Sequence, residues 1–276
     1  MLVVRAQVFD LRNPRQVALS GATELGSKEV IVMQHTANTR HRRRTIKFLG
    51  NLACSSRRNI AINGGLSMYG SHIKVVAING SARKGGNTAI LLRYVMKELE
   101  LEGIETEFIE LSGLKIHRCV SCRKCRTNRD GRCAESDDMG NVLIEKMAQA
   151  DGILFGSPTY LADVSPEIKS LMDRACQVAK ANDGMFRHKV GAAVVSVRRA
   201  GAIHTFDALN HFFLVNEMIV PGSSYWNIGI GREAGEVEMD AEGIATMKTL
   251  GRNMAWLLEN LKNPMAIPEL AEIVSQ

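Results

Sequence analysis

Hydrophobic and polar positions follow two alternating patterns from residue 72 onward. Short, nearly continuous apolar runs predict strands buried on both faces at 72–79, 105–111, 151–156 and 190–197, with a fifth strand around 219–220 and 224–228. Amphipathic helical patterns separate these runs at 89–101, 136–150, 165–179, 205–218 and 241–261. The alternation predicts a doubly wound α/β fold, with a five-stranded parallel sheet between two helical layers in a three-layer αβα arrangement.

Capping signals mark the starts of two of these helices. Ser165 followed by Pro166 is typical of an N-cap with proline at the first helical position. Ser136 is expected to cap the preceding helix, because the two acids after it suit the positive end of the helix dipole. Cys176 lies on or near the apolar face of the 165–179 helix and is interpreted as a core residue.

A polar, glycine-rich loop joins the first strand to the first helix at 80–88. A strand, such a loop and a helix together direct backbone N–H groups and the helix dipole toward a phosphate. The loop lacks the Lys-Ser/Thr ending of a Walker A motif and is not G-x-G-x-x-G, which disfavours ATP, GTP and a dinucleotide. Ser81, Arg83, Asn87 and Thr88 suit a terminal monophosphate such as that of FMN, although an ordinary capped turn explains the last two equally well. A phosphate site after the first strand favours the sheet order 2-1-3-4-5.

Four of the six cysteines fall in the segment 117–135, with spacings of two, two and seven residues. They are Cys119, Cys122, Cys125 and Cys133. Three thiolates at successive CxxC intervals can surround one face of a metal–sulfur cluster, and the fourth returns after a turn at Asp130-Gly131. Six basic residues surround the cysteines, against Asp130 as the one acid between them, and would offset the roughly two negative charges of a thiolate-bound [4Fe-4S] core.

Three other interpretations of this segment stay open. A structural zinc site usually has two separate CxxC pairs, whereas here the pairs share a cysteine. Disulfides fit a small secreted domain, but the chain has 276 residues and shows no secretory signal. An unmetallated loop of reactive thiols is the remaining alternative, because spacing alone does not prove a metal.

Charge separates the chain into a leader and a body. Residues 1–67 carry eleven basic and three acidic residues, a balance of +8, whereas the rest carries 24 basic and 26 acidic residues, a balance of −2. The leader is therefore expected to be disordered or not part of the native chain, with translation starting at Met68. The domain is expected over 68–262, followed by a tail over 263–276. The near-neutral body weighs against a nucleic-acid partner. No apolar run approaches the ~20 residues that span a bilayer, so a cytoplasmic protein is expected.

Two further loops at the ends of strands are candidate ligand contacts. The residues 157–161 place a proline and an aromatic side chain after the third strand, where α/β sheets bind ligands. The residues 198–202 follow the fourth strand in the same way.

Three motifs in this order resemble those of a known family. They are Gly80-Ser-Ala-Arg-Lys-Gly-Gly-Asn-Thr88, the run from Cys119 to Cys133 followed by Asp137-Asp-Met139, and Gly156-Ser-Pro-Thr-Tyr160. Together they resemble the iron-sulfur flavoproteins, in the NADPH-dependent FMN reductase branch of the flavodoxin-like superfamily. The resemblance covers about residues 72–262 and excludes the leader.

The resemblance implies a ligand set and an assembly. The phosphate of FMN would be held by Ser81, Arg83, Gly86, Asn87 and Thr88. The isoalloxazine would be bordered by Pro158, Thr159, Tyr160, Leu161, Arg199, Ala200 and Gly201. The four cysteines would bind a [4Fe-4S] cluster. Family members form homodimers or tetramers that bring the flavin and cluster of different subunits close, with ferredoxin or another redox protein as a partner.

Two functions within this fold compete, and a third belongs to another class. The first is an FMN-dependent oxidoreductase that transfers electrons between FMN and a [4Fe-4S] cluster. The second is an NAD(P)H-dependent FMN or quinone reductase without the cluster. The third is nucleic-acid binding through the basic leader. No side chain is expected to act as a catalytic acid or base, because the cofactors carry the chemistry.

Overall fold

A computed structural model describes residues 72–262 of the chain. The predicted leader, its cysteine Cys54 and the predicted tail lie outside these residues. Within them, no helix is long and apolar enough to cross a membrane.

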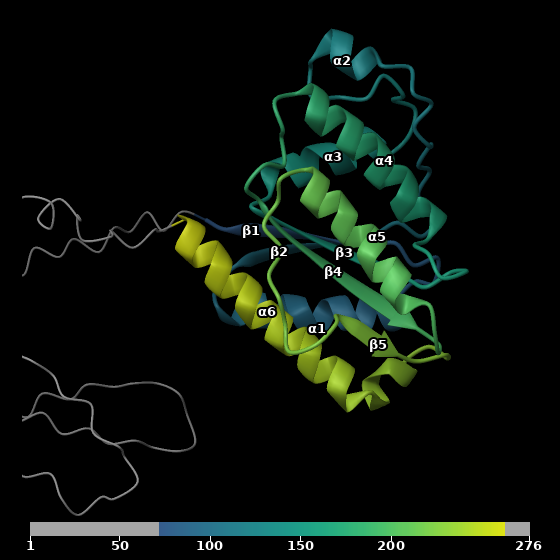
Figure 1. Cartoon of the computed structure of the whole chain (residues 1–276), viewed down its shortest axis with the longest axis vertical. Helices are drawn as coiled ribbons and strands as arrows, with labels where there is room; N and C mark the ends of the chain where they lie inside the picture. The colour runs from purple at the N-terminus through teal and green to yellow at the C-terminus, as the bar shows by residue number, and fades with distance from the viewer. Residues whose placement is uncertain (1–71, 263–276) are drawn as a thin grey trace, which may run out of the picture. The chain divides into compact units, whose positions relative to one another are not determined.

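Five parallel strands form the predicted sheet in the order β2-β1-β3-β4-β5 (Figure 1), which confirms the fold class. The strands are β1 (Lys74–Asn79), β2 (Glu105–Glu110), β3 (Gly152–Pro158), β4 (Val190–Val197) and β5 (Ile228–Ile230). The central strands β3 and β4 are buried along nearly their whole length, as expected for strands covered by helices on both faces.

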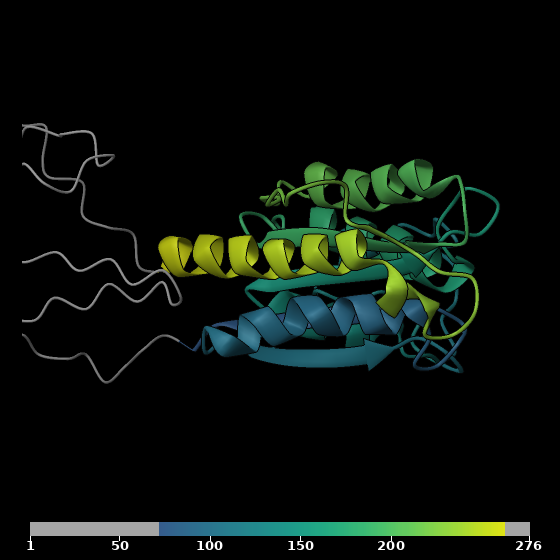
Figure 2. The same ribbon diagram turned by 90° about the horizontal axis from the view of Figure 1, so that it is seen from below.

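Helices cover both faces of the sheet. They are α1 (Asn87–Leu101), α2 (Lys124–Asn128), α3 (Gly140–Gln149), α4 (Pro166–Ala181), α5 (Ala202–Val215) and α6 (Ala241–Lys262), with a 3-10 turn at Glu236–Met239. On one face α1 packs beside α6, and α3, α4 and α5 lie on the other (Figures 1 and 2).

Alternate strand residues supply the two cores. In β1, Val76 and Ile78 pack with α3, α4 and α5, whereas Val75 and Ala77 pack with α1 and α6. All four side chains are fully buried. The continuous apolar runs in the sequence therefore reflect two hydrophobic layers that share one sheet.

Two predicted elements are displaced from their expected positions. The helix expected at 205–218 begins at Ala202, directly after Gly201, which has a left-handed φ of 85°. The fifth strand lies at Ile228–Ile230, and Ile219 forms only an isolated bridge with Val190. Pro221 has no backbone N–H to continue that pairing, so the chain leaves the sheet and returns beside the end of β4.

The cysteine segment differs most from the prediction. Ser136 does not cap α3, whose N-cap residue is Met139. Instead, the Asp138 carboxylate accepts a hydrogen bond from the Gly140 amide at 2.9 Å. The short helix α2 was not expected, because five residues are too few to show a helical period.

Candidate flavin and cysteine sites

A cavity of about 390 Å³ lies at the carboxyl ends of β1, β3 and β4. Its walls include Ser81, Arg83, Gly86, Asn87, Thr88, Pro158, Thr159, Tyr160, Ser196, Val197, Arg198, Gly231, Arg232, Glu233 and Ala234. The fold thus brings the predicted phosphate loop and the loop after β3 to one site, as expected where the strand order of a doubly wound sheet reverses.

The phosphate loop holds its shape through its own hydrogen bonds. The Asn79 side chain accepts a hydrogen bond from the Ser81 amide at 3.0 Å, and the Ser81 hydroxyl accepts one from the Arg83 amide at 3.1 Å. The first hydrogen bond of α1 runs from the Ile90 amide to the Gly86 carbonyl at 3.1 Å. The three preceding helical amides therefore have no carbonyl partner within α1, which is the arrangement that binds anions.

Two side chains expected to contact phosphate make other contacts. Thr88 is buried and its hydroxyl shares a 2.7 Å hydrogen bond with the Ser196 hydroxyl. The Asn87 amide group donates to the Glu233 carbonyl at 2.9 Å and accepts from the Gly235 amide at 2.8 Å. Both residues line the cavity, and their hydrogen bonds connect α1 to the loop 231–234 and to β4.

The loop 231–234 forms a wall that the sequence analysis missed. Its polar, glycine-rich sequence is typical of any surface loop. Arg83 donates to the Arg232 carbonyl at 3.4 Å, so the loop connects to the phosphate loop through Arg83 as well as Asn87. Gly231 lets these segments approach closely, since a Cβ there would lie 2.6 Å from the Val237 amide nitrogen and 2.9 Å from the Asn87 side chain.

The loop after β3 ends in a tight two-residue turn. Tyr160 and Asp163 exchange two backbone hydrogen bonds of 2.9 Å across Leu161 and Ala162, which have left-handed φ angles of 50° and 60°. Tyr160 lines the flavin-sized cavity and is 40% exposed, whereas the Leu161 side chain is fully exposed and does not line it.

The loop after β4 borders a neighbouring hollow. Arg199, Ala200 and Gly201 line a cavity of about 300 Å³ together with the exposed aromatic residues Tyr225 and Trp226. Of this loop, Arg198 instead lines the flavin-sized cavity, together with residues of the phosphate loop. The expected isoalloxazine contacts are thus divided between two adjoining cavities that share Val197.

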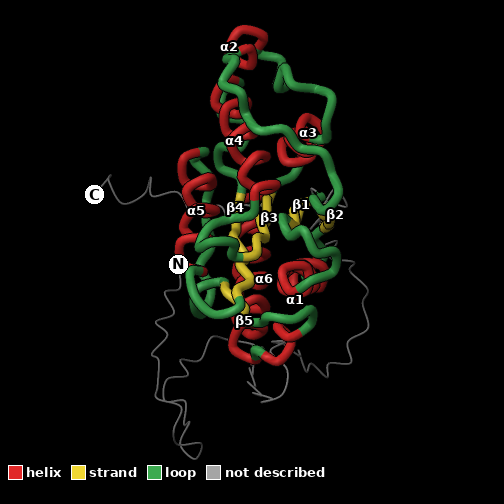
Figure 3. The backbone as a smooth tube through the Cα atoms, turned by 90° about the vertical axis from the view of Figure 1, so that its right-hand side faces the viewer, coloured by secondary structure: helices red, strands yellow, loops and turns green. Residues whose placement is uncertain are grey.

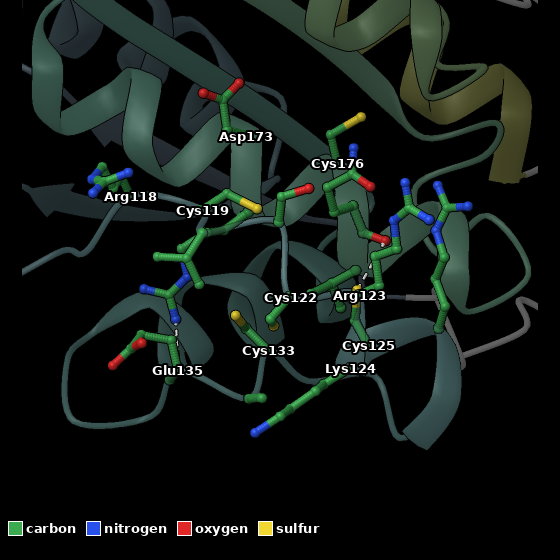
Figure 4. A pocket seen from close by; sticks show the side chains of 17 residues that line it. Arg118, Cys119, Cys122, Arg123, Lys124, Cys125, Cys133, Glu135, Asp173 and Cys176 are labelled. Carbon is green, nitrogen blue, oxygen red and sulfur yellow. Dashed lines mark hydrogen bonds between the residues drawn. The ribbon is translucent and has the colours of Figure 1, made fainter.

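The four cysteines of the segment 117–135 line one further cavity, of about 560 Å³ (Figure 4). Cys125 belongs to α2, and the other three lie on the loop before and after it. Figure 3 shows this segment as a long loop that carries α2 out beside α4. Cys176, on α4, packs against the core as expected. It also lines this cavity, which the sequence did not indicate.

The backbone around the cysteines bends sharply and is anchored by side chains. Ser121 and Arg123, on either side of Cys122, have left-handed φ angles of 54° and 61°, which strains non-glycine residues. Asn141 accepts a hydrogen bond from the Cys133 amide at 2.7 Å and donates to its carbonyl at 2.9 Å. The Cys125 thiol is 3.8 Å from the Gln177 carbonyl oxygen. α3 and α4 therefore hold the loop in its bent form.

The thiols are close enough to interact but are not tightly clustered. Burial raises the pKa of Cys125, and the negative charges of Cys133, Cys122 and Cys119 raise it further. The five cysteines within 72–262 form no disulfide, and no three of their sulfur atoms lie within 4.8 Å of one another.

An ion pair lies beneath the cysteine loop. The side chains of Arg174, on α4, and Asp138 are both completely buried and bonded to each other. Asp138 also accepts from the His117 amide at 2.6 Å. Burial would raise the pKa of Asp138, but the His117 amide, Arg174 and the Gly140 amide outweigh that effect and lower the pKa.

Basic side chains surround the entrance of the cysteine cavity. Arg129 pairs with Asp183 at 2.6 Å and Arg132 with Glu145 at 3.6 Å. Across the described part of the chain, the remaining basic residues of the segment have no carboxylate within 4.0 Å; they are Arg118, Arg123, Lys124 and Arg126. This surface carries positive charge, as its composition predicted.

Comparison with known proteins identifies the family of the chain. The family model described as NADPH-dependent FMN reductase matches residues 73–233. An iron-sulfur flavoprotein of Methanocaldococcus jannaschii is 36% identical over 197 residues, covering 69% of this chain and 100% of the relative. A second from the same organism is 33% identical over 192 residues, covering 65% and 94%.

Solved structures support the fold independently of sequence. RosB, solved with the bound intermediate 8-demethyl-8-formylriboflavin-5'-phosphate, superposes with a TM-score of 0.55 at 20% identity, covering 70% of this chain and 82% of its own. A flavone reductase superposes with a TM-score of 0.52 at 18% identity, covering 70% and 65%. The chain belongs to the NADPH-dependent FMN reductase family, among the relatives named iron-sulfur flavoproteins, and is an FMN-binding oxidoreductase of flavodoxin-like fold.

Proposed function

We propose that this oxidoreductase transfers electrons between FMN and a [4Fe-4S] cluster bound by Cys119, Cys122, Cys125 and Cys133. The observation that carries the proposal is the convergence of these four cysteines on one cavity of about 560 Å³ that shares no lining residue with the flavin-sized cavity. The names of the relatives at 33–36% identity support the same assignment.

The thiols, as they stand, are too far apart for a zinc site. Zinc–sulfur bonds of ~2.3 Å in a tetrahedral site place the sulfur atoms only about 3.8 Å apart. Within residues 72–262 no three cysteine sulfurs lie even within 4.8 Å of one another. A [4Fe-4S] cluster binds each thiolate through a different iron and therefore suits a wider set. Zinc binding would require the sulfur atoms to move closer together.

Each part of the chain then has a defined task. Bound FMN supplies one- and two-electron chemistry, and a bound cluster relays single electrons. The amides at the start of α1, with Ser81 and Arg83, bind the terminal phosphate. Pro158, Thr159 and Tyr160 border the flavin ring at the end of β3, and residues 231–234 form another wall of the cavity.

The proposed assembly is a homodimer or tetramer in which the two cofactors of different subunits approach each other. This proposal is supported by the two cavities of one chain, which share no lining residue, so that the two cofactors of one subunit are held apart. Sedimentation of the protein with both cofactors bound tests the assembly. NAD(P)H is the proposed electron donor to the flavin. The basic surface at the cysteine cavity suits an acidic redox protein such as a ferredoxin, and electron transfer to it should slow as ionic strength rises.

The proposal predicts that the two cofactors can be lost separately. Cys122→Ser should remove most of the iron and leave FMN bound, because the two sites are built from different loops. Iron, acid-labile sulfide and FMN content of the anaerobically purified variant provide the measurement. Cys176→Ser is the matched control, since Cys176 lines the same cavity from α4 and is not an expected ligand.

Either of two results would contradict the proposal. Equal iron content in Cys122→Ser and the unaltered protein would exclude Cys122 as a ligand. Loss of FMN together with iron would show that the loop is a structural part of the flavin site. If the protein binds FMN but never iron, the NAD(P)H-dependent flavin or quinone reductase becomes the better assignment.

A further inference from the structure

Arg174 is a completely buried cation beside the cysteine cavity. It lies on α4, and its side chain has no exposed surface. Besides the ion pair with Asp138, it donates to the Glu135 carbonyl at 2.6 Å and to the His117 carbonyl at 3.3 Å. These partners lie on both arms of the cysteine loop, before Cys119 and after Cys133, so one guanidinium ties the two arms together.

The Arg174 side chain is buried in a space that the absence of a side chain at Gly140 leaves open. Gly140 begins α3 directly against the guanidinium, and a Cβ at that position would overlap its carbon and nitrogen atoms. Burying an arginine is unfavourable unless its charge and its N–H groups are satisfied. The Asp138 carboxylate supplies the charge, and both terminal nitrogens donate to oxygen atoms.

One donor of Arg174 remains without a partner. Its Nε atom is buried, and no group in the described part of the chain accepts a hydrogen bond from it. Arg174 is also one of the residues that line the cysteine cavity. Burial lowers the pKa of its guanidinium, but Asp138 and the negative charge of Cys133 outweigh burial and raise the pKa. An unpaired buried donor is costly in a folded protein, and a negatively charged sulfur centre in this cavity would compensate it.

We propose that Arg174 is a positioning residue for the cysteine centre, which fixes the Cys133 arm of the loop and places a permanent positive charge beside the sulfur ligands. This inference rests on the proposed [4Fe-4S] cluster. A fixed positive charge favours the reduced, more negative form of the centre, so Arg174 raises its reduction potential. Neither Arg174 nor Asp138 touches the flavin-sized cavity.

The test compares Arg174→Met and Arg174→Lys with the unaltered protein. The midpoint potential is measured by an anaerobic redox titration followed by electron paramagnetic resonance, together with iron and FMN content. Arg174→Met should make reduction of the cluster about tenfold less favourable, equivalent to ~59 mV for a one-electron couple. Arg174→Lys keeps the charge and should retain most of the potential, while it loses iron more readily because it lacks the planar fork.

Arg187→Met is the matched control for removing an arginine ion pair. Arg187 bonds to Glu217 at 2.7 Å on the surface and does not line the cysteine cavity. This variant should leave the potential and the iron content unchanged. FMN content should stay constant in all three variants.

Several outcomes would overturn the inference. If Arg174→Met lowers the iron content but the remaining clusters keep their reduction potential, Arg174 has only a structural role and the inference is wrong. If Arg174→Met does not fold, Gly140→Ala displaces the guanidinium without removing its charge, and an unchanged potential there would contradict the proposal. If the unaltered protein binds FMN but no cluster, both the proposed function and this inference are wrong. If it binds a cluster whose reduction potential does not change when Arg174 is substituted, only the inference is wrong.

Discussion

At the scale of single residues, chemistry was easier to predict than orientation. The four cysteines were recognised from spacing alone, and the structure brings them to one cavity. Asn87 and Thr88 line the flavin-sized cavity, and their side chains also bond to Glu233, Gly235 and Ser196, so their contact with a phosphate stays a prediction. Residue type shows that a side chain can donate a hydrogen bond, whereas only the folded chain determines the acceptor.

Arg174 shows the limit of sequence analysis at this scale. An arginine on an amphipathic helix is normally solvated, and nothing in the α4 sequence marks this one as buried. Its partners, Glu135 and Asp138, are about 40 residues away in the chain and become neighbours only when the cysteine loop folds onto α4. Local pattern cannot predict such a contact.

A prediction at the residue scale concerns the strained turn beside the flavin-sized cavity. Ala162 is exposed and has a φ of 60°, which costs L-residues other than glycine about 1 kcal/mol. Ala162→Gly should therefore raise the free energy of unfolding by roughly 0.5 kcal/mol, after allowance for the greater freedom of glycine in the unfolded chain. Urea denaturation measures the change.

The control for this prediction is a glycine at a helical position. Ala245 is exposed on α6, so Ala245→Gly should lower the free energy of unfolding by about 1 kcal/mol. If Ala162→Gly destabilises the protein as much as Ala245→Gly does, the left-handed turn is not a source of strain.

At the scale of elements, long periodic segments were predicted well and short ones were not. The first four strands and the helix that starts after Ser165 match closely, because continuous burial and a capping serine leave clear signals. Ser165 accepts the expected hydrogen bond from the Ile168 amide, at 3.4 Å. The three-residue strand β5 and the five-residue helix α2 carry too few residues for a periodic signal.

The displaced start of α5 has a similar cause. Its N-cap residue is Gly201, which offers no side-chain acceptor, so the sequence gives no capping signal there. Thr205, chosen as the start, instead lies buried in the first turn, where its hydroxyl is 3.3 Å from that of Thr159. The helix start was therefore placed three residues late.

At the scale of the whole molecule, the order 2-1-3-4-5 determines where the chemistry takes place. Because β1 and β3 are neighbours in the sheet, the loops that follow them reach the same cavity. The cysteine segment instead follows the edge strand β2 and extends over α4, which separates it from that cavity. One chain thus presents two sites, and the proposed function requires a redox cofactor in each.

The most direct test is the iron, acid-labile sulfide, zinc and FMN content of protein purified without oxygen. The proposed function predicts about four irons and four sulfides per chain beside one FMN, with no stoichiometric zinc. One FMN without iron, after anaerobic reconstitution with iron and sulfide has been attempted, would contradict it and assign the chain as a flavin reductase with an empty cysteine loop.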